Sequence, residues 1–303
     1  MTRHLLRRLG GTLLVLLAVS FIIFAALDVI PGDAAEAMVG DSASQEQLDA
    51  LRHEMGLDVP LVPRYLAFLS GLLTRGELGR SLISGRQITG LLADSFPYTL
   101  LLALIATALG TIAGMLIGTL AATHSGGYLD TIIMGTTALG QAVPTFWSAL
   151  LLILLFSLAL GWLPVVGASS PKHLVLPAIT LAVPMAAVVA RLMRSSILEE
   201  LNAYYVLTAR AKGASSRRVM LGHVFRNSLI PVINLLGLYL GRLLGGAFIV
   251  ETIFGWPGLG RLTVQAIFDR DLPVVLGAAL TIATMFLIIN FLVDLGHAWL
   301  DPR

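Results

Sequence analysis

The segment Tyr204–Val232 decides the fold of this chain; it reads YYVLTARAKGASSRRVMLGHVFRNSLIPV and lies between two long apolar runs. The residues before Gly213 are mainly good helix formers, and Gly213 suits the left-handed conformation that often ends a helix. Ser215 or Ser216 can cap a second helix, which is expected to end near Pro231, where the next apolar run begins. The sequence therefore predicts two short helices at a tight turn, with a basic surface. Such a hairpin is either a loop that only carries positive charge or a rigid knob that fits a cytoplasmic partner.

The composition of the whole chain is that of an integral membrane protein. Apolar residues make up 56% and charged residues 13% of the 303 residues, and the mean hydropathy is +0.86. Soluble domains average roughly 45–50% apolar and about 25% charged residues. The formal net charge of +2 does not favour nucleic-acid binding, and the lack of cysteine excludes disulfides and thiolate chemistry.

Six apolar runs predict six transmembrane helices in a single transmembrane domain over residues 1–303. They lack the alternation of a β-barrel, and in lipid a helix satisfies its own backbone hydrogen bonds. The first run also resembles the start of a signal peptide, so cleavage near Ala35 is a second interpretation of it. Three prolines, Pro144, Pro177 and Pro184, mark either functional kinks or ordinary membrane-helix prolines. The predicted spans are residues 9–30, 99–122, 132–158, 174–194, 229–250 and 273–296.

The distribution of charge predicts the orientation in the membrane. Arginines precede the first span and cluster in residues 195–228, whereas acidic residues outnumber basic ones in residues 31–98. The positive-inside rule then places both termini and residues 195–228 in the cytoplasm. Residues 31–98 and 251–272 form extracytoplasmic loops on this assignment.

The long extracytoplasmic loop is expected to contain two amphipathic helices. One is predicted from Ser44, with Gln47 completing a capping box, to a stop at Gly56. The other follows Pro63 in RYLAFLSGLL. They are interpreted either as interfacial helices that cover the bundle or as a docking site for a delivery protein.

A search for enzymatic and metal-binding motifs favours no chemistry in this chain. Neither Lys172 nor Lys212 lies in a G-x-x-x-x-G-K-[ST] phosphate loop. His53-Glu54 opens like H-E-x-x-H, but Leu57 stands where the second histidine is required. No G-x-S-x-G elbow occurs. We therefore predict no catalytic residue, no metal site and no cofactor bound by this chain, which by itself is not an enzyme.

The segment Tyr204–Val232 resembles the cytoplasmic signature of ABC importer permeases of the dipeptide/oligopeptide/nickel class. Four further stretches resemble the family in the same order, so the resemblance covers nearly the whole chain. They are PGD (31–33), LRHEMGLDVPLVPRYLAFLSGLLTRGELGRSL (51–82), GWLPVVG (161–167) and GGAFIVETIFGWPGLGRLTVQAIFDRDLPVV (245–275).

This resemblance implies a type I ABC importer permease fold in the bacterial cytoplasmic membrane, all α-helical with six spans. In such importers a second homologous permease completes the translocation path, and an extracytoplasmic binding protein delivers the cargo. One or two cytoplasmic ATPase subunits bind ATP and Mg and close to drive alternating access. Di- or oligopeptides are the expected cargo, with glutathione, a nickel chelate or haem as alternatives. A secondary transporter driven by an ion gradient is the alternative from another class.

The resemblance also assigns roles in the hairpin. Ala209 and Gly213 would allow close packing at the turn, and Tyr205 would anchor the hairpin. Two cations, Arg210 and Lys212, would meet acidic groups on the ATPase. Leu207 departs from the family, which usually has a basic residue there. The predicted ATPase-coupling residues are Tyr205, Thr208, Ala209, Arg210, Ala211, Lys212, Gly213, Ala214 and Ser215.

Two charged residues are assigned to the translocation path. Arg242 is predicted near the middle of the span 229–250, where an arginine costs about 2.5–3.5 kcal/mol. It is therefore expected either to line the path and attract a peptide carboxylate or to pair with the sister subunit. Glu251, at the outer end of the same span, is interpreted as a lip residue or a pairing site.

Overall fold

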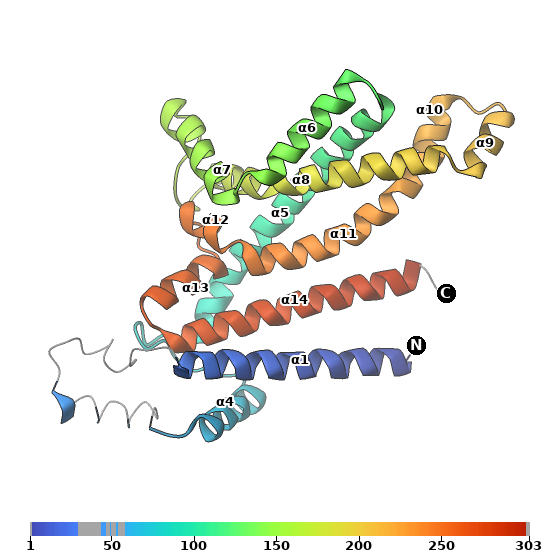
Figure 1. Cartoon of the computed structure of the whole chain (residues 1–303). Helices are drawn as coiled ribbons and strands as arrows, with labels where there is room; N and C mark the ends of the chain where they lie inside the picture. Colours follow the sequence, from blue (N-terminus) through green and yellow to red (C-terminus); the bar gives the residue numbers. More distant parts are fainter. Residues whose placement is uncertain (1, 30–43, 47–48, 50–52, 54–57, 301–303) are drawn as a thin grey trace. The chain divides into compact units, whose positions relative to one another are not determined.

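The computed structural model describes residues 2–29, 44–46, 49, 53 and 58–300. This part of the chain is almost entirely helical, with one isolated bridge between Arg80 and Gln87 (Figure 1). The chain divides into two compact units, and the long helices α5 and α14 each contribute residues to both. The first unit comprises Met1–Thr99 and Pro257–Ile288, and the second comprises Leu100–Trp256 and Ile289–Arg303.

In the first unit an aromatic cluster joins α1 to α4. The ring of Tyr65 packs edge-on against Phe21 and Phe24, with centroid distances of 5.2 and 5.5 Å. Its hydroxyl lies 2.7 Å from that of Ser20 on α1. The amphipathic stretch after Pro63 is α4, whereas most of the helix predicted from Ser44 lies outside the described residues. The helices of this unit are α1 (Thr2–Val29), α4 (Leu61–Arg75), the start of α5 (Ile88–Thr123), α13 (Leu259–Phe268) and most of α14 (Leu272–Leu300).

The core of the first unit forms where α5, α13 and α14 meet. Ile88, Leu259 and Ala278 are buried there, one from each helix. A Cβ atom added to Gly277 would lie 2.6 Å from a methyl carbon of Ile88, so glycine allows α14 to approach α5 closely. Such small residues are common where membrane helices pack tightly.

The second unit is built around α8. This helix packs against α6, α7 and α11, and its interior positions from Leu176 to Ile197 are largely buried. The helices of this unit, besides the rest of α5, are α6 (Tyr128–Ala142), α7 (Thr145–Leu152), η1 (Ile153–Ala159), α8 (Lys172–Leu201), α9 (Tyr204–Ala211), α10 (Ser216–Val219), η2 (Met220–Val224), α11 (Phe225–Gly246) and α12 (Phe248–Ile253).

Two of the predicted spans differ in the structure. The run 132–158 is a pair of helices, α6 and α7 with η1, bent by 102°. Pro144 explains this break, because it lacks a backbone N–H and holds the preceding residue extended. The helix that contains the span predicted from residue 229 begins earlier, at Ser216, since α10, η2 and α11 form one continuous helical segment with Pro231 inside it.

Within the described ranges, four helices are long and apolar enough to cross a membrane. The bent pair of α6 and α7 with η1 makes a fifth span if it is counted as one. Within the 28-residue helix α1, Leu13–Ala26 is a shorter apolar stretch of the described residues. Six spans and two cytoplasmic termini therefore stay predictions. The four long helices are Ile88–Thr123, Lys172–Leu201, Ser216–Leu244 and Leu272–Leu292.

Candidate functional site: the hairpin between α8 and α11

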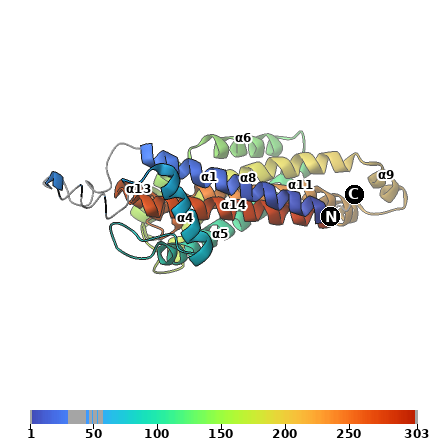
Figure 2. The same ribbon diagram turned by 90° about the horizontal axis from the view of Figure 1, so that it is seen from below.

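The hairpin predicted from the sequence is present, but its first helix is separate from α8. That helix ends at Leu201, and α9 begins at Tyr204 after the extended residue Ala203. At the turn Gly213 has φ +83°, the left-handed conformation expected from the sequence, and its N–H donates to the carbonyl oxygen of Arg210 at 2.9 Å. Views from two directions place α9 at one end of α8 and α11, beyond which it projects (Figures 1 and 2).

The second arm of the hairpin continues directly into α11. Ser215 is the residue before α10 and is extended, at φ −65° and ψ 151°, but its side chain makes no capping hydrogen bond. Its carbonyl oxygen accepts the N–H of Val219 at 3.0 Å and so starts the helix. Ser215 therefore starts α10 through its backbone conformation and not through the side-chain hydrogen bond of a serine cap. The second arm of the hairpin is joined rigidly to a long helix.

Valine side chains attach the hairpin to α8. Val206 of α9, Val219 of α10 and Val224 of η2 are at most 1% exposed. They belong to one buried cluster with Met193 and Ile197 of α8. Each fully buried valine is worth roughly 1.5–3 kcal/mol relative to an exposed one. Both arms of the hairpin therefore move with the end of α8 as one packed body.

Tyr205 attaches α9 to the end of α8. Its hydroxyl donates a short hydrogen bond to the carboxylate of Glu200, and the side-chain amide of Asn227 donates to the same carboxylate oxygen at 3.4 Å. Its ring lies against that of His223, with centroids 6.4 Å apart. Burial, and then the bond to Glu200, raise the pKa of the Tyr205 phenol. The phenol is thus a neutral donor, and it holds α9 against the end of α8.

The outward surface of α9 carries a different tyrosine, one that the sequence analysis did not assign. Tyr204 is 87% exposed and Leu207 is 56% exposed. They share one side of the helix with Thr208 and Ala211, at the spacing i, i+3, i+4 and i+7. The sequence contains this spacing, but the spacing defines one side of a helix only if the helix begins at Tyr204. We call this set, Tyr204, Leu207, Thr208 and Ala211, the outward face of α9.

The predicted coupling residues lie on this face, as Thr208 and Ala211 do, or beside it and at its base. Basic side chains are exposed beside it, including two further arginines of α10. Ala209 and Ala214 are half-buried at the turn, like Tyr205 at the base. The predicted residues that are exposed are Thr208, Arg210, Ala211, Lys212, Gly213 and Ser215, and the added arginines are Arg217 and Arg218.

A buried ion pair supports α8 close to the hairpin. Both guanidinium nitrogens Nε and Nη2 of Arg194 donate to the carboxylate of Asp130, at 2.6 and 2.7 Å. The Asp130 side chain is 7% exposed and also accepts the N–H of Gly126 at 3.0 Å. This bidentate contact joins α8 to the first turn of α6. The dipole of α6 also favours a carboxylate at that turn. Sequence analysis missed it because the partners are 64 residues apart.

The two residues assigned to the translocation path differ in exposure. Arg242 is exposed on α11, but it lies close to the end of that helix and not near the middle of a span, because α11 ends at Gly246, earlier than predicted. Glu251 lies on α12 and is completely buried. The helix α12 packs against α7 and α8, so Glu251 lies inside the second unit, and its assignment as a lip residue or a pairing site stays a prediction. Among the residues that the structure describes, no cluster of three or more His, Asp or Glu side chains is suited to a metal ion.

Two protein-family models match the chain. Residues 1–103 match the N-terminal part of binding-protein-dependent transport system membrane components. Residues 110–303 match the binding-protein-dependent transport system inner membrane component. Together they account for nearly the whole chain.

Curated relatives match over the full length. The chain is 40% identical over 302 residues to the glutathione transport system permease protein GsiC of Pectobacterium atrosepticum, covering 100% of this chain and 98% of that protein. The GsiC protein of Escherichia coli K12 is 38% identical with the same coverage. The di/tripeptide transport system permease protein DppB of Pseudomonas aeruginosa is 39% identical over 332 residues, again covering 100% and 98%.

Solved structures agree on the fold. A chain of the inward-facing MetNI methionine ABC transporter has a TM-score of 0.58 at 18% identity, covering 67% of this chain and 93% of that chain. A chain of an amino acid ABC transporter has a TM-score of 0.55 at 21% identity, covering 68% and 92%. At this identity the likeness concerns the fold alone. With the family matches over both parts of its length, the chain belongs to the inner-membrane permease components of binding-protein-dependent ABC importers.

Proposed function

We propose that this permease pairs with a second, homologous permease and imports peptides, driven by cytoplasmic ATPase subunits that dock on the hairpin. An extracytoplasmic binding protein would deliver the cargo. ATP and Mg would be bound by the ATPase chains and not by this chain. The observation that carries the proposal is the hairpin: a rigid base with an apolar outward face and a basic rim.

The outward face of α9 has the properties of a protein-docking surface. Tyr204 and Leu207 stand exposed at the tip of a packed body, where burial in a cleft would remove their apolar surface from water. Aromatic residues of this kind supply much of the binding energy at protein interfaces. The cations around them would orient the hairpin toward acidic groups of an ATPase. Because Leu207 replaces a usual basic residue, the matching position of the cleft is expected to be apolar.

The cargo is proposed from the relatives that match the chain over its full length. One is named for glutathione and another for di- and tripeptides, and glutathione is itself a peptide. These names support a short peptide over a nickel chelate or haem. The rigid docking hairpin supports an ATP-driven importer over a secondary transporter.

Arg242 is proposed to meet an anionic group in the translocation path. Its exposed position on α11 allows contact with the carboxylate of a passing peptide, or with an acidic residue of the second permease. Arg242→Gln is expected to reduce uptake in the first case and assembly of the complex in the second. Uptake and assembly that both stay unchanged would exclude either role.

Co-purification tests the docking proposal with a matched pair of variants. Leu207 lies on the outward face of α9, whereas Leu221 on η2 is equally exposed, 57% against 56%, but lies outside that face. We expect wild type and Leu221→Asn to retain the second permease and the ATPase chains in mild detergent. Leu207→Asn is expected to retain the second permease and lose the ATPases. Recovery of the chain alone, with uptake driven by an ion gradient, would refute the proposal and favour a secondary transporter.

A further inference from the structure

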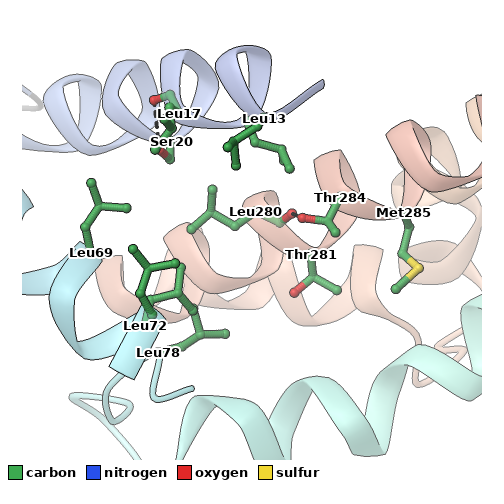
Figure 3. A pocket seen from close by; sticks show the side chains of 12 residues that line it. Leu13, Leu17, Ser20, Leu69, Leu72, Leu78, Leu280, Thr281, Thr284 and Met285 are labelled. Carbon is green, nitrogen blue, oxygen red and sulfur yellow. Dashed lines mark hydrogen bonds between the residues drawn. The ribbon is translucent and has the colours of Figure 1, made fainter. Parts of the chain in front are cut away.

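Two arginines of α8 connect this helix to α6 in the second unit. Arg194 makes the bidentate contact with Asp130 in the first turn of α6. Near the other end of α6, Arg191 donates a short hydrogen bond to the side-chain oxygen of Gln141. In the first unit, by contrast, leucines of α1, α4 and α14 line an apolar groove (Figure 3). Apolar contacts have no preferred direction, whereas a bidentate hydrogen bond fixes the geometry of both partners. The arginines therefore hold α6 in one register on α8.

The same part of α8 carries the hairpin on another of its sides. Met193 and Ile197 of α8 pack with the buried valines of the hairpin. At 3.6 residues per turn, these two side chains lie roughly 110° around the helix axis from Arg191 and Arg194. The hairpin projects beyond the end of α8, and α6 packs along α8 (Figures 1 and 2). One short part of α8 therefore contacts the hairpin with an apolar side and α6 with a basic side.

Burial makes the contact of Asp130 with Arg194 difficult to separate. The Asp130 side chain is 7% exposed and accepts a third hydrogen bond, from the N–H of Gly126. Separation of the pair would leave a buried carboxylate without its cation, which is strongly unfavourable. The pair of Arg86 and Asp94 in the first unit is different, since both side chains are more than half exposed and water can replace either partner.

The far end of α6 leads to the break at Pro144, after which α7 packs against α8 and α12. Non-helical backbone at membrane depth is tolerated where it is buried in protein or lines a cavity. We propose that Asp130 and Arg194 are positioning residues for transport, whose contact makes α6 follow the end of α8 that carries the hairpin. Movement of the hairpin by the ATPases then reaches the bent helix pair through α6. This inference rests on the proposed function.

Spin-label distances test whether α6 and the hairpin move together. The chain contains no cysteine, so Tyr128→Cys on α6 and Leu221→Cys on η2 supply two labelling sites, both exposed in the wild type. Pulsed electron paramagnetic resonance measures their distance in the assembled complex, whose partner chains are freed of reactive cysteine. We expect the same distance without nucleotide and with a non-hydrolysable ATP analogue. A distance that changes with nucleotide would overturn the proposal.

Asp130→Asn, added to the labelled chain, is expected to make this distance depend on nucleotide. The matched control is Thr137→Val, because Thr137 is also buried on α6 but its hydroxyl donates to Met134 of the same helix. The control should behave as the wild type does. A distance that stays independent of nucleotide in Asp130→Asn would refute the positioning role. If that variant does not assemble, Arg194→Lys replaces it under the same criterion, since lysine keeps the charge but not the bidentate geometry.

The ratio of uptake to ATP hydrolysis supplies a second readout. The complex is reconstituted in proteoliposomes with its binding protein, and glutathione or dialanine is the cargo. We expect Asp130→Asn to keep its ATPase chains and lower the ratio several-fold, while Thr137→Val keeps the wild-type ratio. Equal ratios, with ATP-dependent uptake present in the wild type, would overturn the positioning role alone. A wild type without ATP-dependent uptake of either cargo would refute the proposed function as well.

Discussion

Replacing Gly118 by alanine is expected to force α5 and α8 apart. Gly110, Gly114 and Gly118 recur one turn apart on α5 and face α8. A Cβ atom at Gly118 would lie 2.4 Å from the carbonyl oxygen of Ala190, whereas ordinary contact begins at 3.4 Å. The two helices would have to separate by about 1 Å, because a backbone carbonyl cannot rotate away as a side chain can. Gly118 therefore sets the distance between two helices of the second unit.

The magnitude follows from two opposing terms. Overpacking of a well-packed core costs typically 1–3 kcal/mol, and alanine regains up to about 1 kcal/mol of helix propensity over glycine. The cost here is expected at the upper end of its range, since the clash is with backbone. At about 2–4 °C per kcal/mol for chains of 150–250 residues, Gly118→Ala should lower the melting temperature by several degrees.

Thermal unfolding of the detergent-purified chain measures this effect. Gly90→Ala is the control, because Gly90 lies in the same helix and no atom lies within 4 Å of its added Cβ. That control is expected to leave the melting temperature unchanged or slightly raised. Equal melting temperatures for both variants would refute the close approach of α5 and α8.

Three further outcomes are expected. Asp130→Asn should destabilise the chain, because it removes the carboxylate to which both guanidinium nitrogens of Arg194 donate; denaturant titration measures this, and Asp130→Asn with Arg194→Gln should recover part of the loss. Gly213→Ala should strain the turn by about 1–2 kcal/mol at φ +83° and weaken ATPase recovery, with Gly213→Asn less affected. The raised pKa of Tyr205 stabilises the neutral phenol, so its contribution is complete below the unfolded pKa of about 10 and is lost as the pH rises through the folded value. Limited proteolysis of the hairpin between pH 8 and 11 should show this loss in wild type and not in Tyr205→Phe.

Local sequence determined the class of this protein and the turn of its hairpin. Apolar runs of membrane length, the basic segment between two of them and the absence of enzymatic motifs depend only on residue types and spacing. The left-handed Gly213 is equally local, because glycine alone adopts φ +83° without strain. The motifs shared with importer permeases indicated the family, and the family model and the full-length relatives confirm it.

Tertiary packing decided the features that depend on distant residues or on the exact start of a helix. The break after Leu201 turns Tyr205 inward to Glu200 and leaves Tyr204 outward, although both tyrosines have the same local preferences. The ion pair of Asp130 and Arg194 forms only because α6 packs on α8. Neighbouring residues determine which backbone conformations are low in energy. Only contacts between helices determine which side of each helix is buried.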